Sequence, residues 1–429
     1  MKRLRLLTLA ALFPSTVSAQ AMLQEHRPGG AAERHETLRD ARRGFETKLI
    51  AERRAGTPVP APPPELFTVV EYDAPLGASA AYLSPVAEGE SGRPAIVWIT
   101  GGTPVARGGA YVWVPGPVEN DQSIRAYRDA GVVMMFPTVR GTCQNPGAQE
   151  AFFGEVDDVI AAGQYLRGLP QIDPERVYLG GHSTGGTLAL LVAESTDLFR
   201  AVFSFGPVGD LADYGERPWP FDTTDPRELR LRSPLYFLGS ITSPTYIFEG
   251  EFGNSEELPR FMSHNSNPRV SVLQLAGADH FSLLTPVNRH LAAVVVADRP
   301  GPFELDLARV VTAHAEFWPA QREARDLRLI ADLRAEGVAW GTPCEMTFTI
   351  RGRTLALVSE VRRSLAMDGF ESSEPRTELD QDGDPYHRLT LSCVVPLDTP
   401  SVFAAAQIVR GAADAARLVD EGWTASPAR

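Results

Sequence analysis

The sequence predicts an α/β fold, with a mostly parallel sheet covered by helices, followed by a smaller α+β domain. Short apolar runs alternate with helical patterns between residues 65 and 298, which is the order expected of parallel strands buried on both faces. A Pro/Gly-rich stretch at 298–302 then precedes a region in which helical and strand patterns alternate again. With 429 residues the chain has room for two or three domains.

The first 19 residues have the pattern of a signal peptide. Lys2, Arg3 and Arg5 precede an apolar run at 6–13, and small residues at 17–19 predict cleavage after Ala19. We therefore expect an exported protein, periplasmic or secreted. No later apolar stretch has the length of about 18 residues that a membrane span needs, so no span is expected in the mature chain.

Residues 20–64 read as a charged arm and a proline-rich linker. Basic and acidic residues crowd 21–56 without a continuous apolar stripe, which predicts a solvated helix or a mobile arm. Five prolines in 57–64 predict an extended linker. The net charge of −13 makes nucleic acid an unexpected partner.

The predicted catalytic domain covers residues 65–298. Residues 155–166 place apolar side chains on one helix face. The runs that predict strands, the first two of them around a turn, are 66–72, 78–83, 95–100, 132–137, 177–180, 201–205, 245–248 and 270–275.

Ser183 lies in the sequence Gly-His-Ser-Thr-Gly at 181–185, which matches the G-x-S-x-G pattern of a nucleophile elbow. A strand is expected immediately before it at 177–180 and a helix after it at 187–194. A strand-to-helix turn this sharp exposes the serine and requires small neighbours. Ser183 is therefore the candidate nucleophile.

His280 is the candidate general base. It follows the last predicted strand through the loop Ala276–Asp279, 97 residues after Ser183 in the sequence. Serine first and histidine last is the chain order of this type of site. A serine hydroxyl needs such a base because it is a weak nucleophile by itself.

Two backbone N–H groups are expected to bind an oxyanion. The N–H of Thr184 would lie at the start of the helix after the elbow, where the helix dipole favours negative charge. The second donor would come from Gly102 or Thr103, in the glycine-containing loop after the strand at 95–100.

Several linked motifs now point to a family. They are the stretch Gly154–Asp158 with Leu169–Arg176, the double glycine after the serine, Arg232–Leu235 with Ile241–Pro244, and Gly277–Phe281. Through them, residues from about 66 to 298 resemble prolyl oligopeptidase-type serine peptidases of the α/β-hydrolase superfamily. The resemblance implies a Ser–His–acid triad, an acyl-enzyme intermediate and hydrolysis of peptides or esters.

The triad acid departs from the family pattern. The resemblance implies an aspartate about three residues after a glycine that ends a strand, but Gly253 stands three residues after Gly250. Glu251 is the nearest loop carboxylate and our first candidate, with Asp210, after the strand at 201–205, as an alternative. A Ser–His dyad or a degenerate hydrolase are the other possibilities.

Residues 303–429 predict a separate α+β domain. Helices are expected at 326–337, 353–368 and 400–420, and strands at 346–350 and 389–396. This order favours a ferredoxin-like fold, and the pattern faintly resembles the ribonuclease E inhibitor B family, from which we carry over the fold and no activity. Cys344 and Cys393 are the plausible disulfide pair of an exported chain, and separate buried thiols are the alternative.

The sequence therefore predicts a serine hydrolase, with a peptidase favoured over an esterase. Its substrate would be a peptide or ester, and no metal or organic cofactor is needed for the mechanism. The alternative is a catalytically decayed hydrolase-fold binding protein in which the C-terminal domain recognises a partner.

Overall fold

The computed structural model describes residues 36–86, 89–103, 105–215, 217–379, 385–416 and 418–428. They separate into two units, one ending at residue 315 and the other beginning at residue 316, and each is described by itself. The predicted signal peptide at 1–19 and the start of the predicted arm, residues 20–35, lie outside the described residues.

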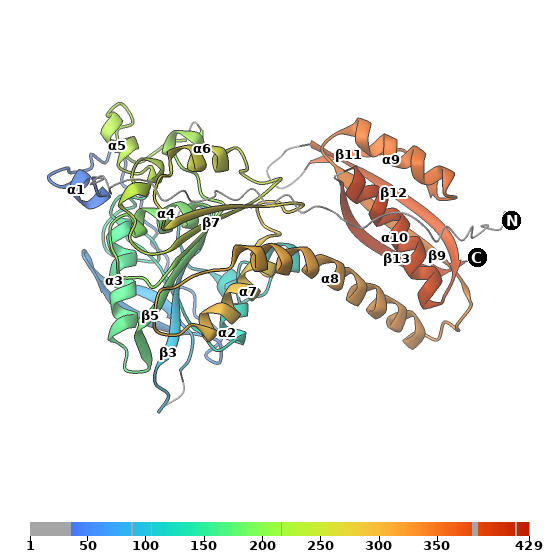
Figure 1. Ribbon diagram of the computed structural model, residues 1–429, viewed down its shortest axis with the longest axis horizontal. Helices are drawn as coiled ribbons and strands as arrows, with labels where there is room; N and C mark the ends of the chain where they lie inside the picture. Colours follow the sequence, from blue (N-terminus) through green and yellow to red (C-terminus); the bar gives the residue numbers. More distant parts are fainter. Residues whose placement is uncertain are drawn as a thin grey trace. The chain divides into compact units, whose positions relative to one another are not determined.

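The first unit is built on a mixed, mostly parallel sheet (Figure 1). The strand order is β1-β2-β4-β3-β5-β6-β7-β8; β1, β2 and β4 pair antiparallel, and all pairs from β4 to β8 are parallel. The strands are β1 (Thr68–Ala74), β2 (Gly77–Leu83), β3 (Arg93–Ile99), β4 (Val133–Pro137), β5 (Ile172–His182), β6 (Val202–Phe205), β7 (Thr245–Gly250) and β8 (Val270–Leu275).

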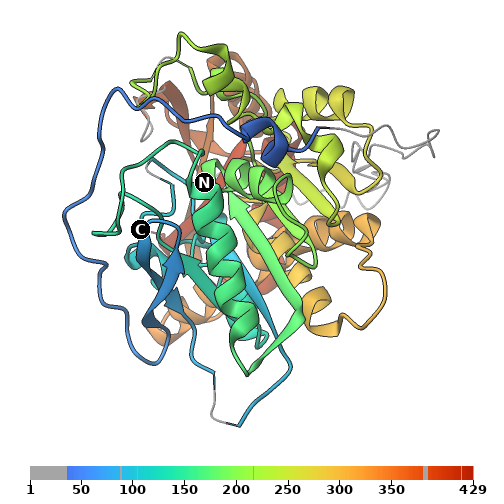
Figure 2. The same ribbon diagram turned by 90° about the vertical axis from the view of Figure 1, so that its left-hand side faces the viewer.

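Helices cover both faces of this sheet (Figure 2). Alternate strand residues supply two cores, as the period of two requires: Val97 and Leu179 pack with α3 and α4, whereas Trp98 and Tyr178 pack with α7. The helices are α1 (Leu38–Arg42), α2 (Ala126–Asp129), α3 (Glu155–Gly168), α4 (Thr184–Ala193), α5 (Pro226–Arg230), α6 (Glu257–His264) and α7 (Leu284–Ala297). Short 3-10 helices are η1 (Ala110–Val112), η2 (Val118–Asn120), η3 (Leu211–Tyr214), η4 (Pro234–Tyr236) and η5 (Leu238–Ser240).

The N-terminal arm, by which we mean residues 36–56, is packed against the first unit. The prediction of a solvated or mobile arm is wrong for these residues. Leu38 is fully buried in the core beside α3. Leu49 forms a β-bridge with Phe221, and the N–H of Gln149 donates to the carbonyl of Arg53 at 3.0 Å. The arm thus docks through Leu38, which is fully buried, and through Phe45 and Leu49, which are partly buried against the same core.

The second unit contains an antiparallel sheet with helices. Its strand order is β10-β12-β9-β13, with β11 pairing β12, and the elements follow one another as strand, helix, strands, helix, strand. The elements are α8 (Leu307–Ala335), which begins before the boundary between the units, β9 (Pro343–Gly352), α9 (Leu355–Met367), β10 (Glu371–Ser372), β11 (Arg376–Leu379), β12 (Pro385–Pro396), α10 (Thr399–Ala415) and β13 (Val419–Pro427).

The end of the second unit differs from the prediction. The helix expected to run to residue 420 ends at Ala415, and the chain continues as β13, which the sequence analysis missed. Tertiary contacts decide this change: β13 pairs with β9, and the buried Trp423 donates its indole N–H to Asp326 at 2.8 Å.

The boundary between the units also lies later than the predicted start at 303. Phe303, Leu305 and Val310 pack into the core of the first unit. Cys344 and Cys393 are free buried thiols rather than a disulfide pair. In the register of β9 and β12, Cys344 faces Val395 and Cys393 faces Met346, so the two cysteines are not directly opposed.

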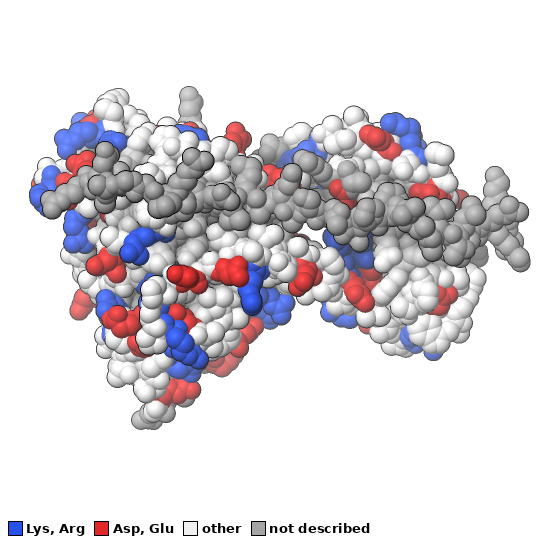
Figure 3. All heavy atoms as spheres, viewed as in Figure 1, with Lys and Arg blue, Asp and Glu red and all other residues white. Residues whose placement is uncertain are grey.

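Acidic and basic side chains are interspersed on the face shown in Figure 3. Among the residues that the structure describes, no helix is both long and apolar enough to cross a membrane.

Candidate active site

Ser183 lies on a strained turn between β5 and α4. Its backbone has φ 57° and ψ −122°, a conformation that costs a non-glycine residue about 1–3 kcal/mol. The N–H of Ser183 donates to the carbonyl of Phe205 at 2.7 Å, which ties the turn to the end of the neighbouring strand β6. A side chain on Gly185 would collide with the carbonyl oxygen of Ile99, so the elbow requires glycine there. The structure thus places Ser183 at the carboxyl end of the central parallel strands.

The loop after β3 lies directly against the elbow. A Cβ on Gly101 would stand 3.0 Å from the Cβ of Ser183, and Thr184 Oγ1 donates to the carbonyl of Gly102 at 2.8 Å. Gly102 itself has φ +98°, a left-handed conformation that glycine adopts readily. The structure therefore brings Thr184, Gly102 and Thr103 together beside Ser183, where backbone N–H groups can stabilise a developing negative charge.

His280 is brought to the same edge of the sheet by the loop after β8. The ring of His182, which precedes the serine, contacts the ring of His280 at a tilt of 41° with centroids 4.6 Å apart, and its Nε2–H donates to the backbone carbonyl of His280 at 2.9 Å. Burial, and then the neighbouring His280, lower the pKa of His182 to about 3. A neutral His182 therefore fixes the position of the His280 loop.

Glu249 supplies the carboxylate that contacts His280. Its Oε2 accepts a hydrogen bond from His280 Nδ1 at 2.9 Å, and the side chain is 1% exposed. Its oxygens also accept from the backbone N–H groups of Gly250 at 2.7 Å and Asn254 at 3.1 Å. Neutral His280 therefore carries its proton on Nδ1 and leaves Nε2 free to accept one, the tautomer that a general base needs. Within the described residues neither Ser183 Oγ nor His280 Nε2 makes a hydrogen bond.

The two carboxylates predicted for this role have other contacts. Glu251 Oε2 accepts from the backbone N–H of Gly277 at 3.1 Å. Asp210 caps η3 through the N–H of Ala212 and accepts from the hydroxyl of Tyr236. The carboxylate that contacts His280 is thus Glu249 rather than the predicted Glu251 or Asp210, because Glu249, the last residue but one of β7, points at the histidine loop. Glu249 is a charged residue between the apolar run 245–248 and Gly250. That position was the signal that could have identified it.

Comparison with known proteins finds a family model that matches part of the chain. Residues 119–229 match the prolyl oligopeptidase family. The matched segment contains Ser183 and Thr184 and ends before Glu249 and His280. No curated protein matches the chain.

Solved structures of hydrolases are similar to part of the chain. A puromycin hydrolase is 19% identical with a TM-score of 0.44, over 58% of this chain and 42% of its own. An acylaminoacyl peptidase is 17% identical with a TM-score of 0.42, over 57% and 44%. An esterase from Pyrococcus furiosus is 14% identical with a TM-score of 0.43, over 57% and 96%. The chain therefore spans less than half the length of the first two.

Gly253 lies against the carboxylate of Glu249. It occupies the position where the resemblance places the aspartate. A Cβ there would collide with Glu249 Oε1, stand 2.7 Å from Glu249 Cδ and stand 3.0 Å from the Cα of His280. The carboxylate of Glu249 thus fills the space that a side chain at 253 would need, so the site requires a glycine there.

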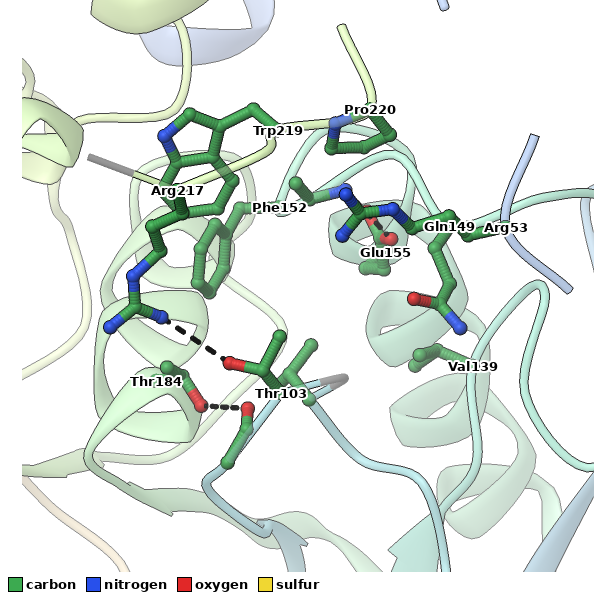
Figure 4. A pocket seen from close by; sticks show the side chains of 13 residues that line it. Arg53, Thr103, Val139, Gln149, Phe152, Glu155, Thr184, Arg217, Trp219 and Pro220 are labelled. Carbon is green, nitrogen blue, oxygen red and sulfur yellow. Dashed lines mark hydrogen bonds between the residues drawn. The ribbon is translucent and has the colours of Figure 1, made fainter. Parts of the chain in front are cut away.

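A small cavity, about 40 Å³ in volume, lies beside the predicted oxyanion donors (Figure 4). Arg217 lines it, and its guanidinium donates to Thr103 Oγ1 at 3.4 Å. The arm supplies Arg53. The residues lining it are Arg53, Gly102, Thr103, Val105, Val139, Gln149, Ala151, Phe152, Glu155, Thr184, Arg217, Trp219 and Pro220.

Glu155 is a buried acid in the lining of this cavity. Oε1 accepts from the backbone N–H groups of Glu150 and Ala151 at 2.7 and 3.1 Å, whereas Oε2 is buried without a partner among the described residues. Burial, reinforced by the nearby charge of Glu150, raises the pKa of Glu155 to about 7.

The raised pKa of Glu155 predicts that stability falls as the pH rises. The unfolded chain releases this proton near pH 4.5 and the folded chain near pH 7, so the folded state binds more protons between these values. The free energy of unfolding should therefore decrease by roughly 3 kcal/mol across this window. Urea unfolding at pH 5 and pH 8 measures it. Glu155→Gln, which keeps an acceptor oxygen, should remove this contribution; an unchanged pH dependence would contradict the prediction.

The described residues contain no group of three or more His, Cys, Asp or Glu side chains that could hold a metal ion.

Proposed function

We propose that the chain is a serine hydrolase of the prolyl oligopeptidase type that cleaves peptide or ester bonds. The observation that carries the proposal is the hydrogen bond from His280 Nδ1 to the buried Glu249, beside a serine held in an elbow conformation. These are the base, its orienting acid and the nucleophile of acyl transfer. Family resemblance favours a peptidase, and an esterase would use the same residues.

The proposed mechanism has two acyl-transfer steps. In the first, His280 Nε2 takes the proton of Ser183 as Oγ attacks the carbonyl carbon, and Glu249 stabilises the positive imidazole. The N–H of Thr184, with that of Gly102 or Thr103, binds the oxyanion. His280 then gives the proton to the leaving group. In the second step, water activated by His280 releases the acyl group from Ser183.

Labelling by a fluorophosphonate probe tests this proposal without knowledge of the substrate. Wild-type protein should be labelled, whereas Ser183→Ala and His280→Ala should not. Ser195→Ala is the matched control and should be labelled like the wild type. Ser195 lies just after the end of α4, where its Oγ donates to the carbonyl of Leu191. A folded wild-type protein that resists labelling would overturn the proposal.

That negative result would favour the alternative, a decayed hydrolase that binds a partner through its C-terminal unit. The absence of an aspartate at the family position was the main argument for decay. Glu249 answers that argument, because a carboxylate contacts His280 from a different place in the chain.

Two further parts of the proposal concern the ends of the chain. The N-terminal pattern supports export to the periplasm or medium, with the catalytic unit facing a peptide or ester substrate there. The strand order of the C-terminal sheet, with helices α9 and α10 between its strands, supports a ferredoxin-like fold. We assign this unit no activity.

A further inference from the structure

The cavity beside Ser183 combines apolar walls with two arginines. Phe152, Trp219 and Val105 line it, and Arg217 and Arg53 stand on opposite sides (Figure 4). Within the described residues neither arginine forms an ion pair. The acid that does line the cavity, Glu155, is held largely protonated below its raised pKa of about 7. The cavity therefore presents positive charge that forms no ion pair with a carboxylate of the described residues.

Arg217 is held in place by contacts with neighbouring aromatic residues. Its guanidinium lies over the rings of Tyr214 and Trp219, at 4.9 and 5.8 Å from their centroids. Its Nε donates to the carbonyl of Tyr214 at 2.9 Å. The same guanidinium reaches Thr103, a residue of the predicted oxyanion loop. Such stacking limits the freedom of the side chain while its remaining N–H groups stay available for a ligand.

The position of the cavity determines which part of a substrate can enter it. Thr103 and Thr184 line it, and their backbone N–H groups are the proposed partners of the carbonyl oxygen. His280, which must protonate the leaving group, does not line it. The group inside the cavity is therefore the acyl chain. A volume of about 40 Å³ corresponds to roughly three water molecules, which suits a short chain.

We propose that this hydrolase prefers substrates whose acyl group carries a carboxylate, recognised by Arg217 with support from Arg53. This inference rests on the proposed function. The shared chemistry is a short acyl chain ending in an anion, as in the half-ester of a dicarboxylic acid or an acidic residue before the cleaved peptide bond. Arg217 is the residue that determines specificity, because its cationic side chain lines the cavity and donates to Thr103 of the oxyanion loop.

Matched substrates test the preference. Wild-type protein should hydrolyse p-nitrophenyl hemisuccinate with a kcat/KM about tenfold above that for the neutral p-nitrophenyl butyrate, and Arg217→Gln should abolish this ratio. The ratio should also fall at high salt, because the arginine is exposed. N-acetyl-glutamyl and N-acetyl-glutaminyl p-nitroanilides distinguish a peptide source from an ester source. Arg227→Gln is the matched control, since Arg227 lies over Phe45 at 4.5 Å and outside the cavity.

Two readouts separate failure of this inference from failure of the proposed function. Fluorophosphonate labelling of the wild type and of the control Arg227→Gln should proceed at the same rate, and it reports an activated serine whatever acyl group the cavity prefers. Binding of monomethyl succinate to Ser183→Ala, followed by calorimetry, needs no turnover and should weaken about tenfold when Arg217→Gln is added. Labelling without a carboxylate preference, a preference for anionic leaving groups, or binding that is insensitive to Arg217→Gln would each overturn the inference.

Discussion

Glu249→Gln is expected to lower the Ser183-dependent hydrolysis rate by about 10³–10⁴-fold. A glutamine at 249 can donate its amide to His280 Nδ1 and so place the imidazole proton on Nε2, where it prevents His280 from accepting the serine proton. It also removes the charge that stabilises the imidazolium. The second-order rate constant of fluorophosphonate labelling and the hydrolysis of p-nitrophenyl acetate both measure the loss.

Glu251→Gln is the matched control for this experiment. It changes a carboxylate two residues away whose Oε2 accepts from the N–H of Gly277, and its rates should stay within a few-fold of the wild type. Thermal unfolding should show that both variants are folded. A larger loss in Glu251→Gln than in Glu249→Gln would return the acid to the position that the sequence predicted.

An aspartate at residue 253 should inactivate the protein when Glu249 is present and should restore part of the activity when Glu249 is replaced by alanine. Gly253→Asp alone places a side chain against the carboxylate of Glu249, which should disturb the His280 loop and bring two negative charges together. In Glu249→Ala/Gly253→Asp the space is cleared and one acid remains. This double variant should label about tenfold faster than Glu249→Ala.

The rescue separates a triad from a dyad. If the acid contributes nothing, Glu249→Ala will label like the wild type and the second substitution will have nothing to restore. Gly253→Asn in the Glu249→Ala background is the control without charge and should give less recovery than aspartate. Equal recovery by asparagine would show that space, and not the carboxylate, controls the rate.

Local patterns were sufficient to predict the elements that carry Ser183 and His280. The elbow motif consists of consecutive residues, 181–185, and His280 follows shortly after the apolar strand at 270–275. Glu249 was missed because the analysis looked for an acid in the loop, whereas the structure uses the end of an otherwise apolar strand. A buried charge in such a strand is rare unless it is paired. Glu249 should therefore have been expected to have a charged or hydrogen-bonding partner.

The contacts that the sequence could not reveal are those between distant segments. β13 exists because β9 has an edge to pair with, whereas the sequence analysis ended its last helix at residue 420 and assigned no strand to the residues after it. The cavity requires Arg53 from the arm, Phe152 from the segment before α3 and Arg217 from the loop after η3. No local pattern predicts that these three segments meet.

The arm joins two loops that line the cavity without touching the residues that perform the chemistry. The N–H of Ile50 donates to the carbonyl of Pro220 at 2.7 Å, and the carbonyl of Arg53 accepts from Gln149 at 3.0 Å. In the proposed hydrolase, part of the cavity wall thus comes from a segment far in the sequence from the elbow, Glu249 and His280. Substitutions in the arm can therefore reshape the cavity while these three parts of the site stay unchanged.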